Sequence, residues 1–542
     1  MCDIYFPQFK QGKTGTRIHP GLSILDLARN SGVKINAECG GQGKCGKCIV
    51  RIEKGKENLN ELTHAEKNFK LGANERLACQ TTIIRELKDM SVFMKSFGEY
   101  EILKSGTEKE VPVNPVFYKK GDKVFKNEEE IDKYQGKIYG LAIDVGTTTL
   151  VFDLVNLENG DVIATVAKTN PQISYGNDVI SRIGFTLVDE EKGRYFKENE
   201  RTERVRILQE TVVESINSSI KEISERCEED ILRYIYEAVV VGNPTMRNLF
   251  FGFDVASLGL IPFEPGHKES VIKKPEEIGL LINSKGRVFG APLIGGHAGA
   301  DTVADVLASE IYKNKEVGMV IDIGTNGEIV LGNSERMISA SCAAGGAYEG
   351  TTISSGCGAI GGAIKQVEII NGRVAYSTIE DKHPIGICGS GLIDLLAELL
   401  THGIMSKTAK IGQDFYVTGK IKISQQDIYQ LITAKGGLRT DQDLLMKQYP
   451  VDLKNISRIY LAGGFGNFIN VKNAMKIGLI PEAEEEKVVK IGNGALEGAR
   501  EMLLSRQRRE TAKEIAKKIE HCKPNETEKD FAYLVAENMY FR

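Results

Sequence analysis

The sequence offers little that would indicate secretion, a membrane or a nucleic acid. Its 542 residues contain no apolar run close to the roughly eighteen residues that a membrane-spanning helix needs. The start, Met1 to Tyr5, has no basic stretch followed by an apolar core, which a secretory leader requires. The 70 lysines and arginines nearly balance 74 acidic residues, and the net charge of −4 gives no reason to expect nucleic-acid or anionic-membrane binding. We therefore expect a cytoplasmic protein with neither nucleic acid nor membrane among its partners.

Cysteine is scarce as well. Ten cysteines in a chain of this length are too few for a disulfide scaffold. Six are scattered, and an isolated cysteine is more often a small buried hydrophobe than a ligand: Cys2, Cys227, Cys342, Cys357, Cys388 and Cys522. No role is assigned to Cys342, Cys357 or Cys388. The other four cysteines lie between positions 39 and 79 and form a pattern.

The chain is long enough for three or four domains. Residues 1–93 alternate short apolar runs and include one helix expected after Ser23, which is typical of a small α+β domain. Residues 94–137 are strongly charged and indicate a linker or a small bridging subdomain. A new pattern begins at Ile138, and we assign residues 138–542 to one larger domain. Its charged segment 501–518 is expected to be a closing helix or a partner contact.

The cysteine pattern is C-x5-C-x2-C, formed by Cys39, Cys45 and Cys48, with Cys79 following thirty-one residues after Cys48. Three thiolates on one glycine-rich loop and a distant fourth suit a [2Fe–2S] cluster, which needs four such ligands. The glycines allow backbone N–H groups to approach the cluster sulfurs. The alternative is a zinc knuckle, but zinc sites usually pair two short C-x-x-C hooks, and here the fourth cysteine stands alone.

Two glycine turns of one design lie 178 residues apart, from Asp144 to Asp322. Each follows an apolar strand and precedes another, at 139–149 and 320–330, and further strands are expected near 162–167 and 337–341. Glycine permits close approach of successive N–H groups to a phosphate. An aspartate at the end of a buried strand needs a partner, which Mg²⁺ can supply. The pattern predicts an internal repeat of two phosphate turns within two similar lobes.

Further candidates surround these turns. A buried strand near 459–462 enters a glycine turn that contains Gly463 and Gly464, and helices are expected at 202–225 and 300–312. Gly389 and Ser390, with Asp394 nearby, are either part of a nucleotide site or a plain helix N-terminus. In the segment 295–301, His297 or Asp301 could lie near a γ-phosphate, or Asp301 could simply cap the helix that follows.

The cysteine spacing and its surroundings resemble plant-type and adrenodoxin-type ferredoxins, and the five-residue first gap is closer to the latter. This resemblance implies a β-grasp fold with one-electron chemistry over residues 1–93. The two turns and the late glycine motif resemble the phosphate-1, phosphate-2 and adenosine elements of the actin, heat-shock-70 and sugar-kinase superfamily, and this implies a two-lobed actin-like (ribonuclease-H-like) ATPase domain. The superfamily pattern implies contacts with Mg²⁺ and ATP at Asp144, Gly146, Thr147, Thr148, Asp322, Gly324, Thr325, Asn326, Gly463 and Gly464. Asp144, Asp322 and Asp301 are the candidate catalytic residues.

Over nearly its full length the chain resembles the reductive activators of corrinoid-dependent enzymes. The resemblance implies ATP-dependent transfer of one electron to the inactive Co(II) corrinoid of a methyltransferase or O-demethylase partner, giving Co(I). It also implies a low-potential electron donor and a possible homodimer. The resemblance further implies that the cobalamin belongs to the partner. Some relatives carry C-terminal [4Fe–4S] cysteines that this chain lacks, so one cluster is expected.

The competing class is a small-molecule kinase with an appended redox sensor, in which Asp301 would deprotonate a hydroxyl of the substrate. Activators of radical dehydratases share the nucleotide fold, but they resemble dimers that hold one [4Fe–4S] cluster between them, and the four-cysteine module argues against that reading. A binding module with an inactive ATPase is disfavoured because both Asp144 and Asp322 are present.

Overall fold

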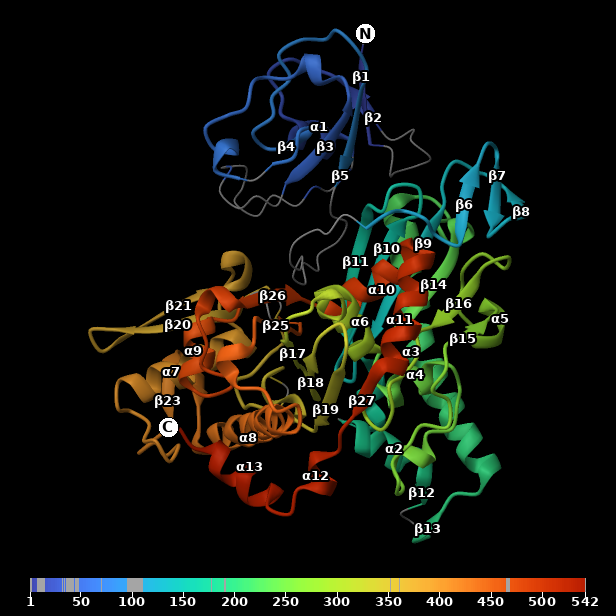
Figure 1. Cartoon of the computed structure of the whole chain (residues 1–542). Helices are drawn as coiled ribbons and strands as arrows, with labels where there is room; N and C mark the ends of the chain where they lie inside the picture. The colour runs from blue at the N-terminus through green and yellow to red at the C-terminus, as the bar shows by residue number, and fades with distance from the viewer. Residues whose placement is uncertain are drawn as a thin grey trace. The chain divides into compact units, whose positions relative to one another are not determined.

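The computed structural model describes residues 2–6, 15–31, 33, 35, 43, 48–69, 71–94, 111–176, 178–189, 192–350, 352–359, 361–464 and 468–541. They divide into two compact units (Figure 1). The first comprises residues 1–99 with 161–165 and 217–234, and the second comprises the rest. No helix among the described residues has the length and apolarity needed to cross a membrane.

The first unit is built on one mixed sheet in the order β2-β1-β5-β3-β4. The strands are β1 (Asp3–Tyr5), β2 (Gly15–Arg17), β3 (Ile49–Lys54), β4 (Glu75–Leu77) and β5 (Met90–Met94). The first and last strands, β1 and β5, pair in parallel at the centre of the sheet. The expected helix is α1 (Ile24–Asn30), where Ser23 Oγ accepts from the backbone N–H of Asp26 at 3.1 Å. This order of strands around one helix is that of a β-grasp domain.

The second unit contains two six-stranded sheets that repeat one topology. The first sheet has the order β11-β10-β9-β14-β16-β15, and the second has the order β26-β25-β17-β18-β19-β27. In the first, β9 (Tyr139–Val145), β10 (Thr149–Asn156) and β11 (Val162–Thr169) lie side by side, and β14 (Ile235–Val241) and β16 (Arg287–Gly290) follow beyond β9. β15 (Val271–Lys273) forms the edge.

The second sheet places its strands in the same way. The hairpin of β17 (Gly318–Ile323) and β18 (Gly327–Gly332) is flanked on one side by β19 (Met337–Cys342). On the other side, β25 (Arg458–Ala462) and β26 (Val488–Gly492) add in parallel, as β14 and β16 do in the first sheet. The predicted repeat is therefore confirmed at the level of strand order, and β27 (Ile519–His521) is an addition next to β19.

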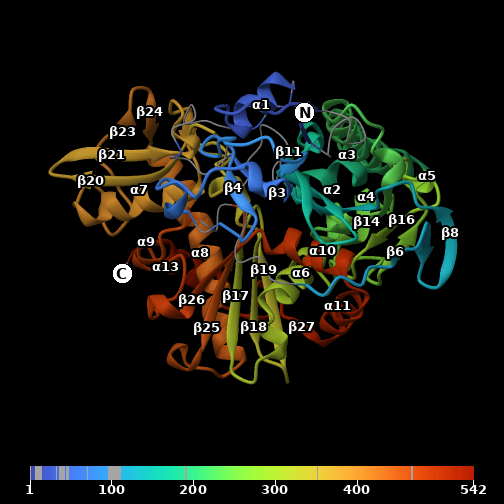
Figure 2. The same cartoon turned by 90° about the horizontal axis from the view of Figure 1, so that it is seen from above.

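Three helices fill the space between these sheets, as Figure 2 shows. They are α6 (Ala300–Ser309), α10 (Gly494–Leu504) and α11 (Arg506–Lys518), and their apolar side chains share one core with both sheets. The expected helix 300–312 is wrong at its end, because Glu310 adopts a left-handed conformation (φ +58°) and a separate 3₁₀ turn follows. The charged segment 501–518 is likewise two helices, divided at Ser505, which caps α11.

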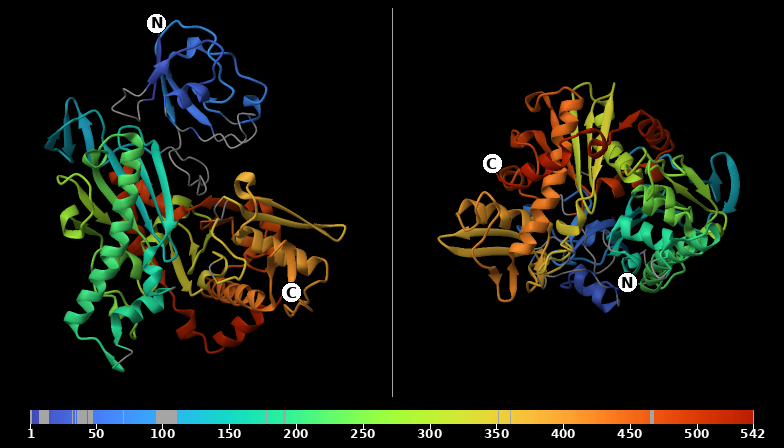
Figure 3. Two further views of the ribbon diagram at one scale, coloured as in Figure 1. Left: turned by 180° about the vertical axis from the view of Figure 1, so that it is seen from behind. Right: turned by 90° about the horizontal axis from the view of Figure 1, so that it is seen from below.

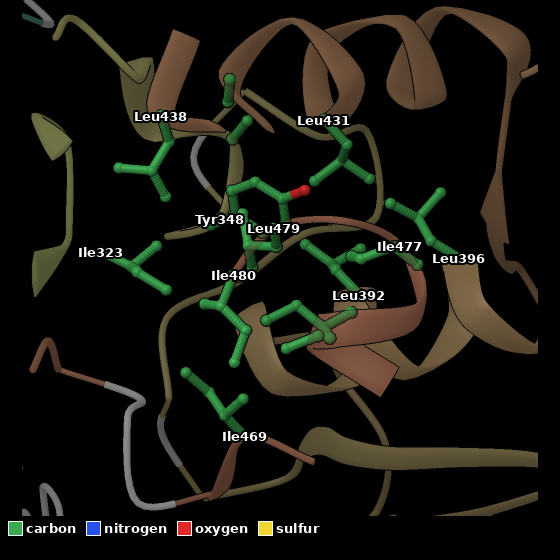
Figure 4. Packing of buried hydrophobic residues seen from close by; sticks show 14 of the residues in the cluster. Ile323, Tyr348, Leu392, Leu396, Leu431, Leu438, Ile469, Ile477, Leu479 and Ile480 are labelled. Atoms are coloured by element: carbon green, nitrogen blue, oxygen red, sulfur yellow. The ribbon is translucent and has the colours of Figure 1, made fainter. Parts of the chain in front are cut away.

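A second core lies on the other face of the second sheet, against α7 (Gly389–Thr401), α8 (Gln425–Gln448), α9 (Val471–Lys476) and α13 (Phe531–Met539). Figure 3 shows α13, in red, running beside the orange helix α8 near the C-terminus. Figure 4 shows part of this core around Tyr348, with Ile323, Leu392 and Leu438 among the labelled side chains. The core fixes the end of β17, where the second phosphate turn begins.

Smaller elements complete the second unit. Its remaining helices are α2 (Val179–Leu187), α3 (Glu198–Cys227, partly in the first unit), α4 (Pro244–Phe250), α5 (Pro275–Ile278) and α12 (Pro524–Thr527). Its short sheets are β12 (Val188–Asp189) with β13 (Arg194–Tyr195), β20 (Ala363–Ile370) with β21 (Arg373–Thr378) and β22 (Gly386–Ile387), and β23 (Phe415–Thr418) with β24 (Ile421–Ile423).

The segment 94–137 contains a three-stranded antiparallel sheet where the sequence suggested a linker or subdomain. Its strands are β6 (Phe117–Lys120), β7 (Lys123–Lys126) and β8 (Glu129–Lys133). Phe117 and Val124 are fully buried and join the core between the two large sheets. This small sheet is thus packed against the second unit.

Candidate functional site

In the first unit, two of the four candidate cluster ligands lie within the described residues. The Sγ atoms of Cys48 and Cys79 are 3.3 Å apart, and both cysteines are free thiols. The hydrogen bond from Cys48 lowers the pKa of Cys79 to about 6 despite burial, and Gln80 Nε2 adds a donor at 3.7 Å from its sulfur. Two convergent thiols, one of them inclined to ionise, fit the ligands of an iron–sulfur cluster. Cys39 and Cys45 lie outside the described residues.

A buried ion pair behind Cys79 holds this side of the site, and sequence reasoning missed it. Glu66 is 1% exposed and accepts from Arg76 Nε at 2.8 Å and from the backbone N–H of Leu77 at 3.0 Å. Burial opposes ionisation of Glu66, but the hydrogen bond from Arg76 and those from the backbone lower its pKa overall. The backbone N–H of Ala78 also donates to the Cys48 carbonyl at 2.8 Å, which joins the two cysteine segments.

In the second unit, the two phosphate turns face one cavity. We call residues 144–149, between β9 and β10, turn 1, and residues 322–327, between β17 and β18, turn 2. The cavity is lined by eleven of the candidate residues: Asp144, Gly146, Thr147, Asp301, Asp322, Gly324, Thr325, Asn326, Gly389, Gly463 and Gly464. The structure thus brings together groups separated by more than three hundred positions. Thr148, Ser390 and His297 are not among the lining residues.

Glycine is required at close approaches in this cavity. A Cβ on Gly146 would lie 2.4 Å from the carbonyl oxygen of Thr149, so no side chain fits in turn 1 at that position. Gly463 has φ +119°, and a Cβ there would lie 2.6 Å from the Ile323 carbonyl oxygen. These positions leave backbone accessible where phosphate and sugar groups could approach. The remainder of the adenosine motif, Phe465 and Gly466, lies outside the described residues.

Two asparagines that the sequence analysis did not single out support turn 1. Asn243 caps α4 by accepting from Met246 N–H and donates through Nδ2 to Thr147 Oγ1 at 2.9 Å. Asn493 caps α10 in the same way, and its Nδ2 donates to Asp144 Oδ2 at 3.1 Å. Each asparagine uses its oxygen for a helix and its amide for the site. The sequence signal was the N-cap pattern before Pro244 and Gly494.

The backbone of turn 1 is held from behind as well. Asn170 Nδ2 donates to the Gly146 carbonyl at 2.8 Å. Arg182, in α2, is fully buried and donates through Nη2 to the Thr147 carbonyl. Burial lowers the pKa of Arg182 to about 10, although the charge of Asp178 acts in the opposite direction. The same guanidinium donates through Nε to the Gly176 carbonyl at 3.0 Å, so it ties turn 1 to the start of α2.

Carboxylates crowd the same cavity. Burial, together with the charges of Asp301, Asp322 and Glu349, raises the pKa of Asp144 to about 8. Burial likewise raises the pKa of Asp301 to about 7 and that of Asp322 to about 6. Asp322 Oδ1 and both oxygens of Asp305 have no hydrogen-bond donor within the described part of the chain. Converging carboxylates without donors are the oxygen-rich surroundings that Mg²⁺ prefers.

The remaining candidates have other contacts. Asp301 lies in the first turn of α6, where it accepts from Thr302 N–H at 2.7 Å, but the N-cap is Gly299, so capping does not account for its carboxylate in the cavity. Ser390 is fully buried in the first turn of α7 and donates to the Lys365 carbonyl at 2.8 Å, whereas its neighbour Gly389 lines the cavity. Asp394 accepts from Asn473 Nδ2 at 2.7 Å. His297 instead lies near the ring of Phe263.

Comparison with known proteins agrees with both sites. Residues 9–83 match the 2Fe-2S iron-sulfur cluster binding domain, residues 139–314 match the family described as RACo middle region, and residues 316–542 match the C-terminal domain of RACo, the ASKHA domain. The expected β-grasp and actin-like fold classes are thereby confirmed.

Relatives of similar length carry related names. The corrinoid activation enzyme RamQ of Eubacterium limosum is 30% identical over 89% of this chain and 90% of its own length. The [Co(II) methylated amine-specific corrinoid protein] reductase of Methanosarcina barkeri is 27% identical over 70% of this chain and 73% of its own length.

A solved structure agrees over the whole chain. A reductive activator for corrinoid, iron-sulfur protein is 27% identical, with a TM-score of 0.73 over 100% of this chain and 98% of that one. The protein therefore belongs to the family of reductive activators of corrinoid proteins, in which a [2Fe–2S] ferredoxin domain is joined to an ASKHA ATPase domain.

Proposed function

We propose that this protein uses ATP to transfer one electron from its [2Fe–2S] cluster to the Co(II) corrinoid of a partner protein, giving Co(I). One observation carries the proposal: the same chain holds a convergent thiol pair in its ferredoxin domain and a cavity onto which two phosphate turns open. A kinase of small molecules would need only the second.

We assign four cysteine ligands to the cluster: Cys39, Cys45, Cys48 and Cys79. The cluster supplies a one-electron carrier to the protein. The chain's own contribution is to hold the thiols together, through the Glu66–Arg76 pair and the backbone bond from Ala78 to Cys48. Gln80 lies close enough to donate to the Cys79 sulfur, and donors of this kind raise a cluster's reduction potential.

For ATP, we assign Asp144 and Asp322 to Mg²⁺, because their carboxylates lie near the ends of the two central strands and line the cavity, and Asp322 Oδ1 has no donor among the described residues. The phosphates would lie against the turns, at Gly146, Thr147, Gly324, Thr325 and Asn326. Gly463, Gly464 and Gly389 would face the adenosine. We assign Asp301, which lines the cavity from α6, to orient the attacking water.

The need for ATP follows from energetics. Each ~59 mV of unfavourable potential reduces the equilibrium of a one-electron step tenfold, or about 1.4 kcal/mol. ATP can offset such a cost if it binds two conformations with different affinity. The two lobes on either side of the cavity, each with one phosphate turn, provide elements whose approach ATP would favour.

The proposed partner is the corrinoid subunit of a methyltransferase or O-demethylase system. A low-potential donor must refill the cluster after each transfer. We also propose a homodimer, on the likeness to the family alone.

The test is anaerobic reduction of a Co(II) corrinoid protein by the dithionite-reduced holoprotein, followed through the visible absorption of Co(I), with and without Mg-ATP. We expect Co(I) only with Mg-ATP, and neither Cys79→Ala nor Asp322→Ala should produce it. Cys522→Ala, a buried cysteine outside the cluster, is the matched control and should behave as the unmodified protein. Stoichiometric phosphorylation of a small hydroxylated substrate, with no response of any corrinoid protein, would favour the kinase instead.

A further inference from the structure

Glu349 links the two phosphate turns, although no sequence motif singled it out. Thr325 of turn 2 donates through Oγ1 to Glu349 Oε2, and Thr325 Oγ1 lies 2.9 Å from Thr148 Oγ1 of turn 1. Glu349 is also within hydrogen-bond reach of the Thr148 hydroxyl, and it lines the cavity. One carboxylate therefore gathers a hydroxyl from each lobe.

The number of hydroxyl protons limits what Thr148 and Thr325 can bind at one time. A threonine hydroxyl carries one proton, so Thr325 spends its proton on Glu349. Thr148, with its own single proton, then donates either to Thr325 Oγ1 at 2.9 Å or directly to Glu349. Both hydroxyl protons are thus directed toward Glu349. Thr325 lines the cavity, and Thr148 does not line it but lies 2.9 Å from Thr325, so a phosphate bound at turn 2 would compete with Glu349 for these hydroxyl protons.

The surroundings of Glu349 leave its side chain as the movable part. Before it, Tyr348 is 1% exposed and anchored in the core shown in Figure 4. After it, Gly350 has φ +78°, and a Cβ there would lie 2.5 Å from the backbone nitrogen of Cys357. The backbone is therefore fixed on both sides. Within the described part of the chain no lysine or arginine forms an ion pair with Glu349, so rotating its carboxylate away from the threonines breaks no salt bridge.

We propose that Glu349 is a γ-phosphate gate: its carboxylate holds Thr148 and Thr325 when no ATP is bound and releases them to the γ-phosphate, and it thereby sets the preference for ATP over ADP. This inference rests on the ATP site of the proposed function. ADP has no third phosphate to claim the two hydroxyls, so it leaves the gate in place. The γ-phosphate of ATP must instead replace the Glu349 carboxylate at these hydroxyls, in a cavity already rich in negative charge.

The experiment compares the binding of Mg-ADP and of Mg-AMPPNP, a non-hydrolysable ATP analogue, to the full-length holoprotein by calorimetry. Glu349→Gln keeps the size of the side chain but removes its charge, and it should tighten the analogue about tenfold, as expected for loss of a competing charged hydrogen bond. Binding of ADP should change by no more than about twofold. Asp427→Asn is the matched control: Asp427 is also a buried carboxylate that accepts from hydroxyls, those of Ser354 and Ser424, but it is away from the cavity lining. The control should leave the ratio of the two affinities unchanged.

An unchanged ratio in Glu349→Gln, or equal weakening of both nucleotides, would show that Glu349 only braces the turns, and the gate would be refuted while the ATP site stands. Failure of the unmodified protein to bind either nucleotide would overturn the ATP site itself. If Glu349→Gln does not fold, Glu349→Asp tests the same idea, because a side chain shorter by one methylene cannot keep the Thr325 contact. It should shift the ratio in the same direction, and no shift in it would equally reject the gate.

Discussion

The two phosphate turns have similar sequences, but different kinds of side chain surround them. Turn 1 is surrounded by donors: Asn170 and Arg182 bind its carbonyls, and Asn243 and Asn493 bind its side chains. Turn 2 lies among carboxylates, those of Asp301, Asp305, Glu328 and Glu349, and the charges of Asp301 and Glu349 also reach Asp144 of turn 1. Hydrogen-bond donors hold a turn in place before any ligand binds, whereas clustered carboxylates need a cation to balance their charge. Turn 1 thus has the contacts of a rigid anchor, and turn 2 those of a part that responds to the nucleotide.

The largest expected effect is the same for both turns and is a loss of ATP hydrolysis. Asp144→Asn and Asp322→Asn should each lower the rate of ATP hydrolysis by roughly 100-fold or more, because each removes a charge assigned to Mg²⁺. The measurement is phosphate release at saturating Mg-ATP. Near-normal hydrolysis by either variant would remove that aspartate from the catalytic set.

The second effect, on ATP binding, concerns turn 1 alone. Arg182→Met removes the donor behind turn 1 and should weaken Mg-ATP binding about tenfold, measured by calorimetry, since the Thr147 carbonyl is no longer held. Arg247→Met is the matched control. Arg247 is equally buried, burial lowers its pKa to about 10 as well, and it donates to the carbonyls of His267 and Glu269 rather than to a phosphate turn. If both variants weaken ATP equally, the support of turn 1 is not specific.

A third effect is pH dependence in the absence of nucleotide. The folded state raises the pKa of Asp144 from 3.8 to about 8, so between these pH values the folded protein keeps a proton that the unfolded chain has lost. Stability must therefore fall as pH rises from about 4 to about 8. Urea unfolding across this range measures it. Asp144→Asn should flatten the decline, and a decline of the same slope in that variant would assign it to other groups.

The smallest effect concerns Tyr348, next to the gate. Its hydroxyl is buried and has no hydrogen-bond partner among the described residues. Tyr348→Phe should therefore raise the free energy of unfolding by about 1 kcal/mol, measured by urea denaturation. Tyr236→Phe offers a contrast, since the Tyr236 hydroxyl donates to Asp132 at 3.1 Å and its loss should destabilise by a similar amount. A destabilising Tyr348→Phe would mean that the hydroxyl has a partner in the folded protein.

The sequence predicted what is encoded locally. The turns at Asp144 and Asp322, their flanking strands and the helix after Ser23 all follow from short patterns of glycine, apolar alternation and caps. Contacts between segments far apart in the chain could not be predicted from the sequence. Asn493 contacts Asp144 across almost 350 positions, and the sequence marks Asn493 only as a helix cap. Glu349 lies in a glycine-rich stretch that carries no periodicity, so its role depends on Thr148 and Thr325 being brought together by the fold.

Boundaries were less predictable than elements. The helix that begins at Ala300 was expected to reach 312, because apolar residues continue with helical spacing, but it ends at Ser309 where Glu310 turns left-handed. Sequence periodicity does not register a single residue that changes its backbone conformation.

The most direct test of the account is electron paramagnetic resonance on the reduced holoprotein mixed anaerobically with a Co(II) corrinoid protein. The reduced cluster and Co(II) each carry one unpaired spin, and transfer of one electron removes both. We predict that the two signals disappear together, one for one, when Mg-ATP is added, and that both persist without it. Loss of the Co(II) signal while the cluster signal remains, or equal loss without ATP, would contradict ATP-driven transfer from the cluster to cobalt.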